Sequence, residues 1–197
     1  MANIPDADTK SRDEEDNHII FNIEKRRVYI FCKINRDAAL EMQSLLDEFK
    51  EGDTNKKDTK PITVVVNTEG GLAYQGLAIY DLIRNSGLNF RTVILGEVAS
   101  AGLVVALAGQ ERWMYKHASL KFHATAMQFA EPQKGLEQHE EDVQRGWKNV
   151  VNKLYDEITI VNSKLTTRQI HKLENQEICL TAERALKLGL VHKIIGQ

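Results

Sequence analysis

The alternation of strand-like and helix-like segments in the middle of the chain constrains its fold more than any other feature. Residues 62–67 form a run rich in β-branched side chains, which is typical of a strand buried in a parallel sheet. A helical pattern over 72–85, a second strand-like run over 92–95 and a helix of small residues over 101–108 follow. Because parallel strands joined through helices form right-handed crossovers, this order predicts βαβ units and an α/β fold.

The segments on either side extend this pattern. A strand-like run covers 28–32, and Asn35 after it is suited to cap a helix. An apolar strand is expected over 118–122, and apolar side chains recur at helical spacing over 135–164. Three shorter elements should follow: a helix opened by Thr166, a helix over 181–188 stopped by Gly189, and a strand over 191–195.

Length and composition fit one globular domain. The chain has 197 residues, of which 42% are hydrophobic, so it can bury a sizeable core. We expect a flexible polar segment over 1–17 and a single domain over 18–197. The net charge of −2 argues against nucleic acid or an anionic membrane as a partner. Because we find no apolar membrane span or signal core, and Cys32 and Cys179 form no CxxC motif, we expect a cytoplasmic protein with reduced thiols.

A serine between small residues is the best candidate for a reactive group. Ser100 lies within the stretch Gly96–Gly102, a glycine pair precedes it at 70–71, and His123 follows at the end of an apolar strand. A serine hydroxyl becomes a useful nucleophile when a neighbouring imidazole takes its proton. The oxyanion that then develops needs backbone N–H donors, which close-packed glycine turns can supply. These residues together predict acyl transfer to water, although Ser100 alone could be a helix cap and His123 alone a structural residue.

These segments resemble the proteolytic subunit of the Clp protease. In that family a strand ends in Asn-Ser-Pro-Gly-Gly, and a helix and a strand then lead to Gly-x-x-Ala-Ser-x-Gly with the nucleophilic serine. Here residues 67–71 read Asn-Thr-Glu-Gly-Gly, and 96–102 read Gly-Glu-Val-Ala-Ser-Ala-Gly. Gly71 and Ser100 are 29 residues apart, as expected for the family. The resemblance covers about 17–196 and implies a ClpP/crotonase-type spiral of βαβ units.

The resemblance also implies the roles of the site residues. Ser100 would be the nucleophile and His123 the general base and acid, where the family's Ile-His-Gln-Pro reads Phe-His-Ala-Thr. The backbone N–H groups of Gly71 and Ala101 would form the oxyanion hole. No metal or organic cofactor is needed for such a mechanism. A zinc-protease reading of His139-Glu140 fails because Val143 stands where the second histidine belongs.

The third member of the triad departs from the family pattern. The family places an aspartate five residues before the alanine that opens the next helix, and counting back from Ala182 leads to Glu177. A glutamate can orient an imidazole as an aspartate does. Glu177 could instead be a surface carboxylate in a polar turn, with Glu174 as the competing candidate. The family's proline before the glycine pair is Glu69 here, and we expect its carboxylate to face solvent, away from the oxyanion.

The function implied by the resemblance is a serine endopeptidase that cleaves unfolded polypeptides in a ring-shaped compartment. The ring would be a homo-oligomer of the heptamer type, with an AAA+ unfoldase as partner. Residues 124–164 would form a handle region, in which Trp147 and Tyr155 either interlock subunits or pack within the domain. In the family, two rings pair through a glycine-rich strand after the catalytic histidine. Residues 124–135 lack that stretch, which leaves the number of stacked rings open. Two alternatives are a catalytically inactive ring subunit with a modulating role and a crotonase-like acyl-CoA enzyme.

Overall fold

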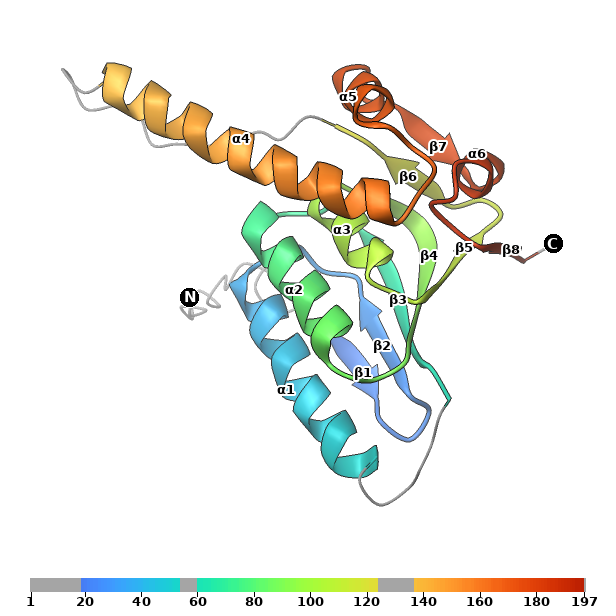
Figure 1. Ribbon diagram of the computed structural model, residues 1–197. Coiled ribbons are helices and arrows are strands. Elements are labelled where there is room, and N and C mark those ends of the chain that lie inside the picture. The colour runs from blue at the N-terminus through green and yellow to red at the C-terminus, as the bar shows by residue number, and fades with distance from the viewer. Residues whose placement is uncertain (1–18, 54–59, 124–136, 197) are drawn as a thin grey trace, which may run out of the picture.

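The computed structural model describes residues 19–53, 60–123 and 137–196, which form a mixed α/β fold (Figure 1). The described strands are β1 Ile20–Asn22, β2 Arg27–Ile30, β3 Ile62–Thr68, β4 Phe90–Ala99, β5 Glu111–Tyr115, β6 Ser119–Lys121, β7 Cys179–Thr181 and β8 Lys193–Ile195. The described helices are α1 Arg36–Asp53, α2 Ala73–Asn85, α3 Ala101–Leu107, α4 Glu137–Val161, α5 Thr167–Asn175 and α6 Ala182–Lys187. The predicted segment 1–17 and part of the predicted handle, 124–136, lie outside the described residues.

The described strands form one sheet with the order β1-β2-β3-β4-β5-β8. Strands β2 to β5 and β8 run parallel, and β1 pairs antiparallel with β2. At its carboxyl end β4 leaves β5 and pairs instead with β6, which in turn pairs antiparallel with β7. This branch in the sheet brings three strand ends together, and the predicted α/β fold of βαβ units is confirmed.

One face of the sheet is buried by helices and the other is only partly covered. Along β3 the side chains alternate between fully buried positions, such as Ile62 and Val64, and half-buried ones, such as Val65. In Figure 1, α1, α2 and α3 lie side by side against the sheet, and α1 packs on α2 and α2 on α3. The β-branched run of this strand is continuous because side chains on both faces of the sheet are at least partly buried, although only one face forms the core.

Most elements match the sequence-based expectations, and the differences have local causes. The expected helix cap is present, because Asn35 Oδ1 accepts a hydrogen bond from the Ala38 N–H at 2.9 Å. Strand β4 is longer than predicted, since its last three residues, Glu97 to Ala99, pair with β6. Strands β1, β5 and β7 were not expected, because two have three residues and β5 begins with charged Glu111 and Arg112.

Helix α4 has a projecting part and a packed part, and both Trp147 and Tyr155 contact residues of the same domain. Its amino-terminal half extends beyond the rest of the molecule in Figure 1, and Val143 in that half is exposed. Its carboxyl-terminal half packs on the domain: Val151 is buried, and the Tyr155 hydroxyl donates a hydrogen bond to the carbonyl of Ala73 at 3.1 Å. Trp147 lies between the two halves, in edge contact with Tyr74.

A buried arginine fastens the end of the chain to the sheet. Arg112 on β5 donates hydrogen bonds to the carbonyl oxygens of Leu190 and Asn162, both at 2.8 Å, and of Gly189 at 3.2 Å. A further bond reaches the Gly109 carbonyl at 3.3 Å. Burial lowers the pKa of the guanidinium, which is nevertheless held by four carbonyl acceptors. The arginine thus joins the end of α4, the turn after α6 and the turn before β5.

Among the described residues, every helix is too short or too polar to cross a lipid bilayer.

Candidate active site

Ser100 occupies a sharp turn between β4 and α3. Its backbone has φ 53° and ψ −127°, a combination that residues with a Cβ rarely adopt. The turn directs the chain from the end of a strand into a helix of fully buried small and apolar residues. Such a strained strand-to-helix turn is how α/β hydrolases expose a nucleophilic serine at the edge of their sheet.

Close packing explains why small residues flank Ser100. A Cβ atom on Gly102 would lie 2.6 Å from the Thr68 side chain, so α3 can approach β3 only because that position carries hydrogen. The Ala101 side chain is completely buried. The small residues on either side of Ser100 thus allow α3 to pack closely against the sheet.

The glycine pair lies against the serine turn. Gly70 has φ 101°, and a Cβ atom there would lie 2.6 Å from Ser100 Cβ. The buried Thr68 hydroxyl fixes this loop: it donates to the carbonyl of Cys32 at 2.7 Å and accepts from the Gly70 N–H at 3.1 Å. Thr68 stands at the serine of the family's Asn-Ser-Pro-Gly-Gly motif, and the sequence alone did not reveal this role.

A backbone bridge orients Gly71. The Ile34 N–H donates to the Gly70 carbonyl at 2.8 Å, and the Leu72 N–H donates to the Ile34 carbonyl at 2.7 Å. In a parallel bridge of this kind the central residue's own N–H and carbonyl point away from the partner strand. The N–H of Gly71 therefore faces away from Ile34, toward the side of the sheet edge where β4 lies. A Cβ atom on Gly71 would be 2.3 Å from the Ile34 carbonyl oxygen, which excludes any side chain.

The strand register brings His123 next to Ser100. Strands β4 and β6 are parallel, and Ala99 is the register partner of Lys121. Ser100 and His123 follow these partners by one and two residues, so both lie just past the carboxyl ends of neighbouring strands. Neighbouring strands are about 4.8 Å apart, which is within the reach of a serine and a histidine side chain. The His123 side chain is half-buried.

The antiparallel register of β6 and β7 brings Glu177 to the same edge. Lys121 pairs with Cys179, and the Phe122 N–H donates to the Ile178 carbonyl at 3.0 Å, so Glu177 falls opposite His123. Glu177 has a positive φ of 47°, at the turn that follows α5. Its carboxylate is 68% exposed and lies 3.6 Å from the Lys121 ammonium group. The fold thus gathers all three predicted triad positions, with the glutamate at the solvent side.

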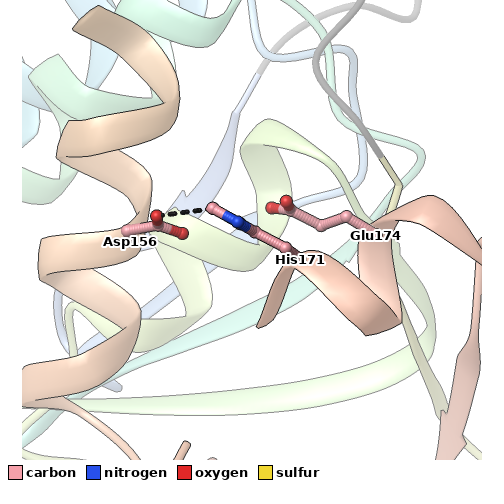
Figure 2. Close-up of side chains that lie close together, drawn as sticks. All are labelled: Asp156, His171 and Glu174. Atoms are coloured by element: carbon pink, nitrogen blue, oxygen red, sulfur yellow. Dashed lines mark hydrogen bonds and ion pairs between the residues drawn. The ribbon is translucent and has the colours of Figure 1, made fainter. Parts of the chain in front are cut away.

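The other two carboxylates considered for the site have partners of their own. Glu69 is 71% exposed and pairs with Lys33 at 3.8 Å, so its charge faces solvent as expected. Glu174, the competing triad candidate, is grouped with Asp156 and His171, as Figure 2 shows. The sequence analysis missed this cluster, because Asp156 is on α4 and the other two residues are on α5.

Comparison with known proteins gives consistent results. The model of the Clp protease family matches residues 11–197. The ATP-dependent Clp protease proteolytic subunit 2 of Chlamydia trachomatis is 28% identical over 143 residues, which are 70% of this chain and 66% of that protein. The ATP-dependent Clp protease proteolytic subunit of Porphyromonas gingivalis is 26% identical over 140 residues, 69% of this chain. The chain spans 60% of the Porphyromonas protein's length.

A solved structure shows the same fold. A point mutant of ClpP1 from Listeria monocytogenes superposes with a TM-score of 0.69 at 25% sequence identity. The match covers 89% of this chain and 94% of the Listeria chain, so the similarity extends over nearly the whole molecule.

Proposed function

Because this chain belongs to the Clp protease family, we propose that it is a serine endopeptidase that cleaves polypeptides through an acyl-enzyme intermediate. The observation that carries this proposal is the register of β4, β6 and β7, which sets Ser100, His123 and Glu177 at one edge of the sheet. A nucleophile, a base and an orienting acid on adjacent strand ends are the groups that such a reaction requires.

In the proposed reaction, Ser100 Oγ attacks the scissile carbonyl while His123 takes the hydroxyl proton. The histidine then returns this proton to the leaving amine, and water hydrolyses the acyl-enzyme by the reverse sequence. Glu177 holds the imidazole in the required orientation. This role asks the carboxylate to turn from Lys121 toward His123, which its exposure at the sheet edge allows.

The oxyanion would be held by two backbone N–H groups. The Gly71 N–H points away from its bridge partner, which supports its availability to a substrate. Ala101 is the first residue of α3, and the first N–H groups of a helix have no partner within the helix. Donors of this kind act on charge that develops in the transition state, where each is worth about 3 kcal/mol.

We further propose that the subunit, as a single domain over 18–197, works in a homo-oligomeric ring of the heptamer type with an AAA+ unfoldase. The similar proteins from Chlamydia and Porphyromonas are described as ATP-dependent proteolytic subunits, which supports such an assembly. The projecting half of α4, with exposed Val143, and Val150 just after it offer apolar side chains to a neighbouring subunit. A cytoplasmic location is proposed because Cys32 and Cys179 are free thiols.

A second function is kept because of one observation. The carboxylate of Glu177 is paired with Lys121 and largely exposed, an arrangement that would leave His123 poorly oriented if it persisted in the assembled protein. In that case the chain would be a ring subunit without its own activity, which modulates an active relative.

An active-site-directed fluorophosphonate distinguishes the two functions. The reagent is added to wild-type protein, to Ser100→Ala and His123→Ala, and to His117→Ala as a histidine control outside the site. A peptidase gives a covalent adduct on Ser100 that is lost in the first two variants and retained in the control. Ring assembly is followed on the same samples by size-exclusion chromatography with light scattering. A ring that takes up no reagent would support the inactive subunit and refute the peptidase.

A further inference from the structure

Three potential metal ligands, none of them a proposed triad residue, meet where α4 packs against α5. Asp156 lies on α4, while His171 and Glu174 lie one turn apart on the same face of α5. One ligand atom from each residue lies within 4.8 Å of the other two. His171 Nε2 is 2.8 Å from Asp156 Oδ2, and Figure 2 shows the imidazole between the two carboxylates.

An unsatisfied oxygen in this cluster indicates that a partner is missing. Asp156 Oδ1 is buried and has no hydrogen-bond partner among the residues that the structure describes, and its side chain is only 13% exposed. Buried carboxylate oxygens almost always have a donor or a cation, because leaving one unpaired is costly. Asp156 Oδ2 is already hydrogen-bonded to His171, so Oδ1 of the same carboxylate needs a second partner, either a cation or a hydrogen-bond donor.

The charge of the cluster is also incomplete. Two carboxylates, those of Asp156 and Glu174, face a single histidine within the cluster. A divalent cation would remove this conflict, since it favours both ionised carboxylates and the neutral imidazole at once. Exposure supports the same reading: His171 is 50% exposed, so water can reach one side of the cluster.

We propose that Asp156, His171 and Glu174 form a binding site for a divalent transition metal ion of the Zn²⁺ type. Imidazole nitrogens and carboxylate oxygens are both protein ligands for zinc, and sites with three protein ligands keep water in the fourth position. Metal–ligand bonds of about 2.1 Å in tetrahedral geometry put neighbouring ligand atoms about 3.4 Å apart. The present separations are 2.8 Å between His171 Nε2 and Asp156 Oδ2 and no more than 4.8 Å within the group, so side-chain rotation can bring them to this value.

An ion in this site links two elements that the sequence separates. It cross-links the carboxyl-terminal half of α4 to α5, and α5 ends at Asn175, two residues before Glu177. A bound ion would therefore hold the carboxyl-terminal half of α4 against the segment that leads to Glu177, the proposed orienting acid. Its ligands are distinct from Ser100, His123 and Glu177, so metal binding and peptidase activity can be tested separately.

The test uses untagged, full-length protein stripped with a chelator and titrated with ZnCl₂ by isothermal calorimetry. We expect one zinc ion per subunit and at least a tenfold weaker affinity in each of Asp156→Asn, His171→Gln and Glu174→Gln. The matched control is Glu157→Gln, which removes the neighbouring carboxylate on α4, one that pairs with Lys153. Circular dichroism confirms that each variant is folded before titration, and these near-isosteric changes give three independent chances of a folded variant.

A second measurement checks the ligand chemistry. Co²⁺ replaces the zinc as a spectroscopic probe, and wild-type protein should develop visible absorption bands that His171→Gln lacks. Excess Mg²⁺ should not displace the cobalt, because magnesium binds imidazole poorly. The proposal is overturned if wild-type protein binds no zinc, if all four variants bind it as wild type does, or if Mg²⁺ displaces the cobalt.

Discussion

The strained backbone of Ser100 predicts that removing its side chain altogether makes the protein more stable than shortening it to alanine. At φ 53° and ψ −127°, any residue with a Cβ is strained, because that carbon comes too close to the backbone of the same residue. Strain of this kind is about 1–3 kcal/mol. Ser100→Ala keeps the Cβ and the strain, whereas Ser100→Gly loses both.

The expected difference is smaller than the full strain. Glycine gains conformational freedom in the unfolded chain, which lowers the free energy of unfolding by about 0.5–1 kcal/mol relative to alanine. The balance leaves Ser100→Gly more stable than Ser100→Ala by about 1 kcal/mol. Because neither variant has the hydroxyl, the comparison is unaffected by the hydrogen bonds of the serine.

Urea unfolding followed by circular dichroism measures this difference, with a second serine as control. Ser86 closes α2 with φ −62° and ψ −26°, an ordinary helical conformation. There Ser86→Gly should be less stable than Ser86→Ala, by about 0.5–1 kcal/mol. If the order at position 100 is the same as at position 86, the serine turn is unstrained in solution and the reasoning is wrong.

Three further changes test other parts of the structure. Arg112→Leu leaves several buried carbonyl groups without a donor and should lower the free energy of unfolding, measured in urea, by roughly 3–5 kcal/mol. The exposed control Arg168→Leu should change it by less than about 1 kcal/mol. A small loss at Arg112 would mean that water replaces the guanidinium. Glu177→Ala should lower kcat for peptide cleavage and Glu177→Asp should retain or raise it, whereas unchanged kinetics in the alanine variant would exclude this carboxylate from the mechanism. Burial and Arg112 lower the pKa of His192 from 6.5, and its Nδ1 accepts the Arg112 N–H at 3.1 Å. The unfolded chain therefore binds the proton more readily than the folded protein, so the free energy of unfolding should fall as the pH drops below 6.5. His192→Asn keeps a hydrogen-bond acceptor but does not titrate, so its stability should fall less. Equal pH profiles of the two proteins would contradict this.

The sequence predicted the fold where local signals and long-range packing agree. The β-branched run of β3 favours a buried strand inside the sheet, and the small residues of α3 favour a helix packed closely against the sheet. The cap of α5 was also readable, because Thr166 and Gln169 form a capping box from residues three positions apart. Strand β5 was missed, since its pairing with β4 and β8 stabilises a segment whose own residues, including Glu111, do not favour a strand.

The candidate site was readable to the extent that motif spacing fixes strand ends. Ser100 and the glycine pair follow buried strands, so their meeting at one edge was predictable from parallel order alone. The exposure of Glu177 and its pairing with Lys121 depend on the turn after α5, which spacing does not specify. The cluster of Asp156 with His171 depends on how two helices cross, and residues 15 positions apart give no periodic signal for that contact.

The close contact of Gly70 with Ser100, and of Gly102 with Thr68, widens the set of positions on which this chain depends. Neither glycine would take part in the proposed reaction, yet a methyl group at either one would displace the serine turn from its place against the sheet. A saturation scan of the gene scored for peptide turnover would therefore show a band of intolerance around the serine that includes chemically silent positions. Changes in substrate specificity would have to come from other positions around Ser100, because neither Gly70 nor Gly102 has room for a side chain.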